Sequence, residues 1–170
     1  MPFAENGAVR LNYNVVGAGP DVMLIHANPF DRRLWRFQVE DFSDRYRMVA
    51  MDLRGYGASD KPDDPFTFDD MMADVLAVCD AAGVKRAIFM GASVGSSLSL
   101  RIALDVPDRV SQLVLVGGNA GVASSGAARI AGYENNGMAY RAAHIQDLVA
   151  PGFADTRRGR ILIDVFLRDD

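Results

Sequence analysis

RAIFMGASVGSSLSLRIAL, residues 86–104, passes from a short apolar run into a helical pattern through the pentapeptide Gly91–Gly95. Glycine weakens strands and helices alike, because it loses more conformational entropy on folding than any other residue. A lone serine, Ser93, lies between the two glycines. The pentapeptide therefore indicates that the backbone around Ser93 needs unusual conformational freedom.

Short apolar runs alternate with longer helical patterns on both sides of this stretch. Strands are predicted at residues 10–16, 22–26, 47–52, 87–90 and 110–117, and helices at 31–44, 67–83 and 94–108. Continuous apolar runs are typical of central strands that are covered on both faces of a parallel sheet. Residues 10–16 alternate instead, which predicts an outer, antiparallel strand. The succession of strand and helix predicts an α/β fold with a mostly parallel, doubly wound sheet.

The predicted helix at 67–83 carries signals at both ends. Thr67 is followed three residues later by Asp70, a spacing close to a capping box, and Gly83 stands at the C-terminal end. Cys79 falls in line with the apolar residues of this helix. We therefore interpret Cys79 as a buried core thiol rather than a reactive one.

The composition is that of an ordinary soluble globular protein. The 170 residues include 18 Lys+Arg and 22 Asp+Glu, for a formal net charge of −4, and 49% of them are hydrophobic. Mild acidity argues against nucleic acid or an anionic membrane surface as a partner. No apolar run approaches the roughly 20 residues that span a bilayer, and no signal-peptide pattern opens the sequence. With a single cysteine and no internal disulfide, we expect a cytoplasmic protein.

A strand followed by Gly-x-Ser-x-Gly and a helix is the pattern of a nucleophile elbow. Ser93 would lie in a strained turn, and Gly91 and Gly95 would lie where a Cβ atom would collide with the neighbouring strand and helix. The free N–H groups of the helix N-terminus would point at the same place. An oxyanion formed by attack of Ser93 would accept a hydrogen bond from the N–H of Val94. The alternative, a flexible turn without chemistry, is disfavoured by this placement.

Two further stretches extend the pattern: LIHANPFDRRLW (residues 24–35) and DLRGYGASDKP (residues 52–62). Together with the pentapeptide they resemble, in order and spacing, three motifs of the α/β-hydrolase family. The first looks like the family's loop after the third strand, usually written His-Gly-x-Pro, and the second like the loop after the fourth. The resemblance is continuous over residues 9–118.

The resemblance implies a role for each matching residue. Ser93 matches the nucleophile, and the N–H groups of Val94 and Asn28 match the two donors of the oxyanion hole. His26 matches a residue that holds the loop and is not the catalytic base. Ala27 stands where the family usually has glycine, so a positive φ there would cost on the order of 1 kcal/mol.

A serine hydrolase that acts on a small carboxylic ester or lactone, through an acyl-enzyme at Ser93, is the function that the resemblance implies. Family members that open epoxides or remove halogens use an aspartate instead. Residues 128–153 loosely resemble the corresponding region of 3-oxoadipate enol-lactonases and small esterases. The competing hypothesis is a non-catalytic small-molecule receptor on the same fold. No cofactor is expected, and two histidines and one cysteine without a cluster predict no metal site.

The stretch 52–62 also concentrates polar side chains that could suggest catalysis: Asp52, Arg54, Tyr56 and Asp60. We interpret them as a turn with solvated charges, shaped by Gly55 and Gly57 and ended by Pro62.

The catalytic acid and histidine follow the serine in this family. His144 is the only histidine after Ser93, and its neighbours predict a helix in the insertion that caps the pocket. Asn119 stands where some relatives carry the acid, and an amide cannot supply the charge. We therefore expect the base and the acid beyond Asp170.

On this interpretation the sequence is the first two-thirds of a hydrolase. Residues 1–120 would be the N-terminal part of the α/β core, and residues 121–170 the start of a helical cap. The C-terminal strands of the sheet would be missing, so that residues 110–117 present an unpaired apolar edge. Residues 1–170 alone are expected to be nearly inactive as an ester hydrolase, because both partners of the nucleophile are absent.

Overall fold

A computed structural model describes residues 2–118 and 152–161. The chain divides into two compact units after Gly118. The first unit, residues 1–118, is called the core unit below. In the second unit, the described residues form a 3₁₀ turn, η4 (Phe153–Asp155), and a helical segment at 157–161.

The core unit is built on a six-stranded sheet with the order β1-β2-β4-β3-β5-β6. Its strands are β1 (Phe3–Asn6), β2 (Val9–Val16), β3 (Asp21–Ile25), β4 (Arg47–Met51), β5 (Ala87–Ala92) and β6 (Val110–Val116). Neighbours among β4, β3, β5 and β6 are parallel, whereas β1 and β2 pair antiparallel. The predicted mostly parallel sheet is therefore confirmed, because the continuous apolar runs became its central strands.

The prediction that residues 10–16 form the outer strand is wrong in one respect. β2 is antiparallel, but β1 lies outside it, with Ala4 opposite Leu11, while Tyr13 of β2 lies opposite Met51 of β4. Only Ala4 of the four β1 residues is buried. In a strand of four residues with one buried side chain, apolar and polar residues do not alternate clearly enough to predict the strand from the sequence.

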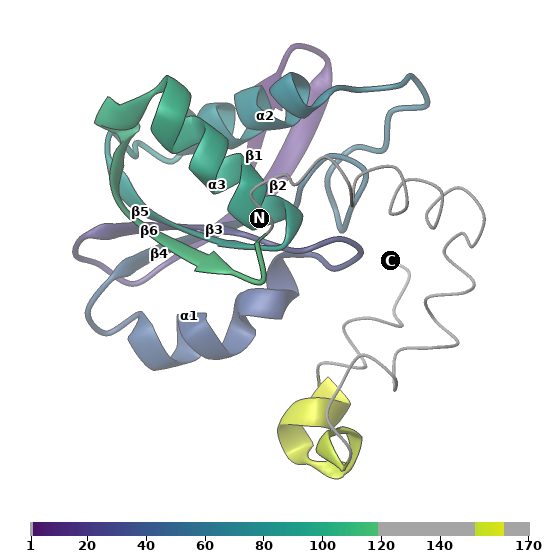
Figure 1. Ribbon diagram of the computed structural model, residues 1–170, viewed down its shortest axis with the longest axis vertical. Helices are drawn as coiled ribbons and strands as arrows, with labels where there is room; N and C mark the ends of the chain where they lie inside the picture. The colour runs from purple at the N-terminus through teal and green to yellow at the C-terminus, as the bar shows by residue number, and fades with distance from the viewer. Residues whose placement is uncertain (1, 119–151, 162–170) are drawn as a thin grey trace. The chain divides into compact units, whose positions relative to one another are not determined.

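Helices cover both faces of the sheet, as a doubly wound fold requires (Figure 1). One face carries α2 (Phe68–Ala81) and α3 (Val94–Asp105), and the other carries the 3₁₀ turn η1 (Arg32–Trp35) and α1 (Arg36–Phe42). The predicted helix at 94–108 ends early, and a separate 3₁₀ turn, η2 (Pro107–Arg109), follows. The residue before a proline disfavours the helical region, which explains the break.

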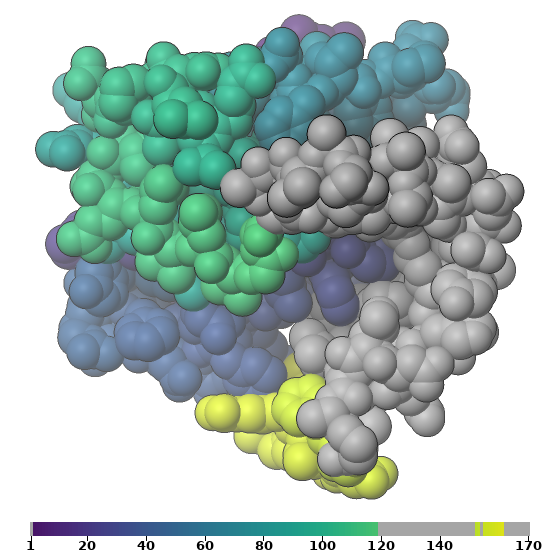
Figure 2. Space-filling view, viewed as in Figure 1, coloured from purple at the N-terminus to yellow at the C-terminus, as the bar shows by residue number. Residues whose placement is uncertain are grey.

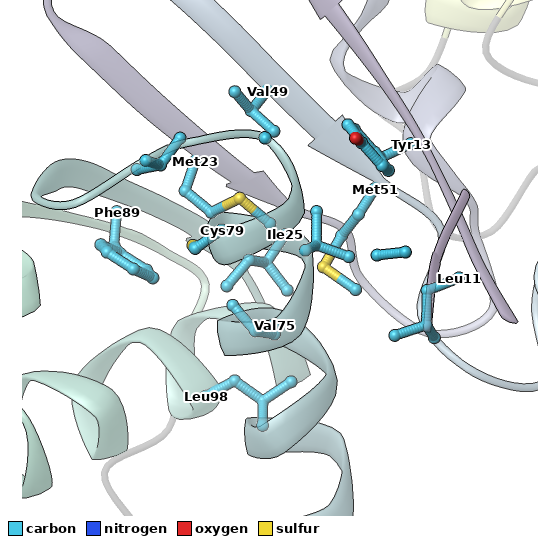
Figure 3. Close-up of a cluster of buried hydrophobic side chains, with 14 of the residues drawn as sticks. Leu11, Tyr13, Met23, Ile25, Val49, Met51, Val75, Cys79, Phe89 and Leu98 are labelled. Carbon is cyan, nitrogen blue, oxygen red and sulfur yellow. The ribbon is translucent and has the colours of Figure 1, made fainter. Parts of the chain in front are cut away.

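The main core lies between the sheet and the α2–α3 layer (Figure 3). Figure 3 shows its central side chains, which include Leu11, Met23, Ile25, Val75, Phe89 and Leu98. A second cluster on the other face packs Trp35 against sheet residues such as Leu24 and Ala50. Two apolar layers hold β3 and β5 rigidly, and the site described below stands on the ends of these two strands.

The signals predicted for α2 are confirmed. The Thr67 side chain accepts a hydrogen bond from the Asp70 N–H, and the Asp70 carboxylate accepts one from the Thr67 N–H, which completes a capping box. Gly83 follows the helix with a φ of +72°. Cys79 is fully buried, and burial raises the pKa of its thiol to about 12. A thiol with this pKa stays protonated at neutral pH, so Cys79 is a core residue and not a nucleophile.

β6 forms one edge of the sheet, as predicted. It pairs with β5 on one side, and no strand of the described residues lies on its other side. Val114, Leu115 and Val116 are 39%, 44% and 46% exposed. Consecutive strand residues point to opposite faces, so both faces of β6 are open here. Figure 2 shows α3 and β6, both green, at the surface of the core unit.

Within residues 2–118 and 152–161, no helix is both long and apolar enough to cross a membrane.

Candidate active site

Ser93 lies at the junction of β5 and α3 in the strained conformation that the sequence predicted. Its φ and ψ are +50° and −112°, and no other non-glycine residue of the described chain has a positive φ. The N–H of Ser93 donates to the carbonyl of Val116 at 2.9 Å, which ties the turn to β6. Such a backbone costs on the order of 1–3 kcal/mol, so the surrounding contacts must hold it in place.

The two glycines are required by close backbone contacts, which confirms the predicted collisions. A Cβ on Gly91 would lie 2.1 Å from the carbonyl oxygen of Gly95. A Cβ on Gly95 would lie 2.2 Å from the carbonyl oxygen of Ile25, at the end of β3. The turn therefore brings α3 directly against β3, which no residue with a side chain would allow.

Two buried serines of α3 hold the turn through hydrogen bonds to backbone carbonyl groups. The sequence pattern alone did not identify them. The Ser96 hydroxyl lies 2.7 Å from the Gly91 carbonyl and 3.0 Å from the Val116 carbonyl, and donates to one of them. The Ser99 hydroxyl donates to the Gly95 carbonyl at 2.8 Å. The sequence feature that could have identified them is their spacing: both are serines, three and six positions after Ser93, on one face of the helix.

His26 holds the loop that follows β3, in agreement with the role that the resemblance implied. Its Nε2 accepts a hydrogen bond from the Leu53 N–H at 2.9 Å, and its Nδ1 donates to the Ala27 carbonyl at 2.9 Å. The ring is fully buried. Both ring nitrogens are engaged, so this imidazole is not the base for Ser93. Ala27 does not have a positive φ, so replacing the family's usual glycine causes no strain here.

The pH dependence of stability follows from this buried histidine. Burial lowers the pKa of His26 from its ordinary value of 6.5. Below that pH the unfolded chain binds a proton that the native state excludes, so the free energy of unfolding falls as the pH drops. One such group contributes a slope of up to about 1.4 kcal/mol per pH unit. We expect urea unfolding to show this loss as the pH falls below about 6.5.

A His26→Gln variant provides the comparison, because glutamine can still accept from the Leu53 N–H and does not titrate. Its stability should change less over the same pH interval than that of the wild-type protein. Equal pH slopes in the two proteins would contradict the assignment of the effect to His26.

The structure brings the three predicted site residues to one edge of the sheet. β3 and β5 are adjacent and parallel, and Ile25 is in register with Gly91. Asn28 follows three residues after Ile25, and Ser93 and Val94 follow just after Gly91, so all lie beyond the carboxyl ends of neighbouring strands. This is the edge at which α/β sheets bind ligands.

The interpretation of residues 52–62 as a turn with solvated charges is wrong for its first charged residue. Gly55 and Gly57 do have positive φ, but Asp52 is fully buried. Its carboxylate accepts hydrogen bonds from the N–H groups of Arg32 at 2.8 Å and Ala58 at 3.1 Å, and pairs with the Arg32 guanidinium. Asp52 therefore joins this loop to the start of η1, which follows β3.

Arg54 is the second buried charge. Its Nη2 donates to the Asp74 carboxylate of α2 at 2.7 Å, and its Nε donates to the second oxygen of the same carboxylate. The bidentate bond to Asp74 raises the pKa of Arg54. Its partner lies on a different element, so the sequence around residue 54 carries no trace of the pair. Asp60, which pairs with the exposed Arg10, is closer to the solvated charge that was predicted.

The remaining predicted candidates, His144 and Asn119, lie outside the described residues. Among the residues that the structure describes, no side chain hydrogen-bonds the Ser93 hydroxyl.

Comparison with known proteins relates this geometry to one family. A family model with the description alpha/beta hydrolase fold matches residues 20–159. The chain is 33% identical over 109 residues to 3-oxoadipate enol-lactonase 2 of Acinetobacter baylyi, a match that covers 63% of the chain and 41% of that protein. It is 36% identical over 110 residues to epoxide hydrolase 1 of Caenorhabditis elegans, covering 62% of the chain and 27% of that protein.

Among solved structures, the enol-lactonase from Burkholderia xenovorans LB400 superposes with a TM-score of 0.84 at 25% identity. That match covers 99% of this chain and 68% of the other. The chain spans less than half of the length of the curated relatives that it matches.

Proposed function

The chain belongs to the alpha/beta-hydrolase fold family, and we propose that it carries the nucleophile and oxyanion hole of a serine hydrolase acting on a small carboxylic ester or lactone. The observation that carries the proposal is the strained backbone of Ser93, with φ +50° between β5 and α3. A strain of this kind persists where the surrounding structure enforces it, and such residues cluster at active sites. Here the two glycines, the bond to Val116 and the buried Ser96 all enforce it.

In the proposed reaction the Ser93 Oγ attacks the carbonyl carbon of the ester while a base removes its proton. The tetrahedral intermediate places a negative charge on the former carbonyl oxygen. That oxyanion accepts hydrogen bonds from the N–H groups of Val94 and Asn28, and the N-terminal end of α3 adds its positive dipole. Collapse expels the alcohol, which takes up the proton, and leaves an acyl-enzyme at Ser93 that water then hydrolyses.

The substrate class is inferred from the nucleophile and from the relatives. A serine forms an acyl-enzyme with esters and lactones, whereas epoxide hydrolases of this family use an aspartate at the same place. The similarity to two enol-lactonases supports the same choice. We therefore favour an ester or lactone over an epoxide, although an epoxide hydrolase is also among the relatives.

We propose that neither the base nor its orienting acid is among the described residues. His26 is fully buried with both ring nitrogens bonded, and His144 belongs to the segment proposed as the start of a helical cap, residues 121–170. The division of the chain after Gly118 supports a core of about residues 1–120 that precedes this cap.

A covalent serine probe separates the enzyme from a non-catalytic receptor on the same fold. The product of the whole gene is treated with a fluorophosphonate and digested, and the labelled peptide is identified by mass spectrometry. The same protein is assayed with p-nitrophenyl esters and with an enol-lactone. Labelling at Ser93 together with turnover supports the proposal. Saturable binding of the lactone without labelling or turnover would indicate a receptor instead.

Ser111 offers a matched control for this experiment, since it lies exposed on β6 and does not have a positive φ. A Ser111→Ala variant should retain full labelling. Loss of the label in Ser111→Ala, or labelling at a serine other than Ser93, would overturn the assignment of the nucleophile.

A further inference from the structure

Hydrogen bonds between three residue pairs join the loop after β4 to the segment that follows β3, from His26 to Arg32. The Leu53 N–H donates to His26, and the Asp52 carboxylate accepts from the Arg32 N–H. In the third pair, the Tyr56 hydroxyl donates to the side-chain oxygen of Asn28 at 2.7 Å. Only this third contact involves Asn28, the residue that the proposed function assigns to the oxyanion hole.

We propose that Tyr56 is a positioning residue for the oxyanion hole, acting through its hydrogen bond to the Asn28 side chain. This inference rests on the proposed function, in which the Asn28 N–H is one of the two oxyanion donors. In this mechanism Tyr56 acts through Asn28 and has no chemical role of its own. Its function is to hold the backbone of Asn28 where the developing charge will form.

Tyr56 is well placed to hold another residue, because its own position is strongly determined. It stands between Gly55 and Gly57, whose φ values are +84° and +50°, in a tight turn. Its N–H donates to the Leu53 carbonyl at 3.0 Å, and its ring packs on the main core. The ring also meets the buried His26 ring edge to face, with centroids 5.5 Å apart.

The geometry of an oxyanion hole is sensitive to such support. Its donors act only when they lie about 2.7–3.1 Å from the position of the oxyanion. Supporting side chains keep that geometry within about 0.5 Å. Tyr56, by fixing χ angles of the Asn28 side chain, restrains the backbone that carries the donor.

The expected consequence is a slower acylation of Ser93 with unchanged substrate binding. Complete loss of one oxyanion donor costs about 10²- to 10³-fold in rate. Misplacement of the donor should cost less, so we expect Tyr56→Phe to slow acylation about 10- to 100-fold. The phenylalanine keeps the contact with the His26 ring and removes only the hydroxyl, so the fold should be retained.

The test is a double-mutant cycle on the product of the whole gene. The acylation rate constant and the substrate dissociation constant are measured from the p-nitrophenol burst for wild type, Tyr56→Phe, Asn28→Leu and the double variant. Leucine keeps the Asn28 backbone N–H and removes the side-chain acceptor. We expect Tyr56→Phe to slow acylation in the wild-type background and to have less than about a twofold further effect in the Asn28→Leu background.

Tyr46→Phe is the matched control. Tyr46 just precedes β4, at the N-terminal ends of the parallel strands, whereas the site lies beyond their carboxyl ends. The loss of its hydroxyl should therefore leave the acylation rate unchanged. Thermal unfolding of each variant shows whether the fold is kept. An equal slowing by Tyr56→Phe in both backgrounds, a change confined to substrate binding, or no change at all would overturn the proposal.

Failure of the underlying function would look different. If Ser93 is not the nucleophile, p-nitrophenol release persists undiminished in Ser93→Ala. If only the role of Tyr56 is wrong, the burst depends on Ser93 and is insensitive to Tyr56→Phe.

Discussion

Replacing Ser93 by alanine is expected to lower kcat for ester hydrolysis by about 10⁴- to 10⁶-fold in the product of the whole gene. The hydroxyl is the atom that forms the covalent bond, and a methyl group has nothing to replace it. The oxyanion hole and the binding contacts would survive, so a small residual rate over the uncatalysed reaction should remain. Steady-state turnover of a p-nitrophenyl ester, measured beside fluorophosphonate labelling, gives both quantities.

Two comparisons make this result specific. Ser111→Ala removes an exposed serine of the same protein and should leave turnover unchanged. Residues 1–170 alone should hydrolyse p-nitrophenyl acetate no faster than their own Ser93→Ala variant, because we propose that neither of their two histidines, His26 and His144, is the base. Turnover by the whole gene product that is unchanged in Ser93→Ala would remove Ser93 from the mechanism.

Gly95→Ala should strongly destabilise the fold. The added Cβ would lie 2.2 Å from the carbonyl oxygen of Ile25 and 2.9 Å from that of His26. Both obstacles are backbone atoms of β3 and the loop after it, which cannot move without disturbing the centre of the sheet. Overpacking of a core costs about 1–3 kcal/mol and sometimes more, and a clash with a central strand belongs at the upper end. We expect urea unfolding to show a loss of about 3 kcal/mol or more.

Gly83→Ala separates this clash from the general cost of replacing glycine. Gly83 has a φ of +72°, and apart from its chain neighbours no atom lies within 4 Å of the position of its Cβ. The variant should therefore lose only the roughly 1–2 kcal/mol that a left-handed backbone costs an L-residue. If the two variants were destabilised equally, close packing of α3 on β3 would not be the reason for Gly95.

Local patterns were sufficient for the elements whose cause is local. The capping box of Thr67 and Asp70 needs only residues three positions apart, and it formed as predicted. The elbow at Ser93 was predictable for the same reason, since both glycines and the serine lie within five residues. The order of apolar runs likewise predicted a mostly parallel sheet, because burial on both faces determines the composition of each central strand.

Contacts between distant segments were not predictable in this way. The local pattern at 52–62 predicts a turn with solvated charges, yet Asp52 is buried in a pair with Arg32, and Arg54 in a pair with Asp74. A charged residue in a sequence is assigned to the surface unless its partner is known, because an unpaired buried charge is too costly. Its partner is identified only when the elements have packed.

The sequence by itself determined the α/β architecture and the place of the candidate nucleophile, because hydrophobic patterning and backbone freedom are properties of neighbouring residues. Only the tertiary structure decided which loop supports the candidate oxyanion hole. The hydrogen bond from Tyr56 to Asn28 spans 28 positions along the chain and exists because β3 and β4 lie side by side in the sheet. Strand order brings such residues together, and it is set by the packing of the whole core rather than by any segment.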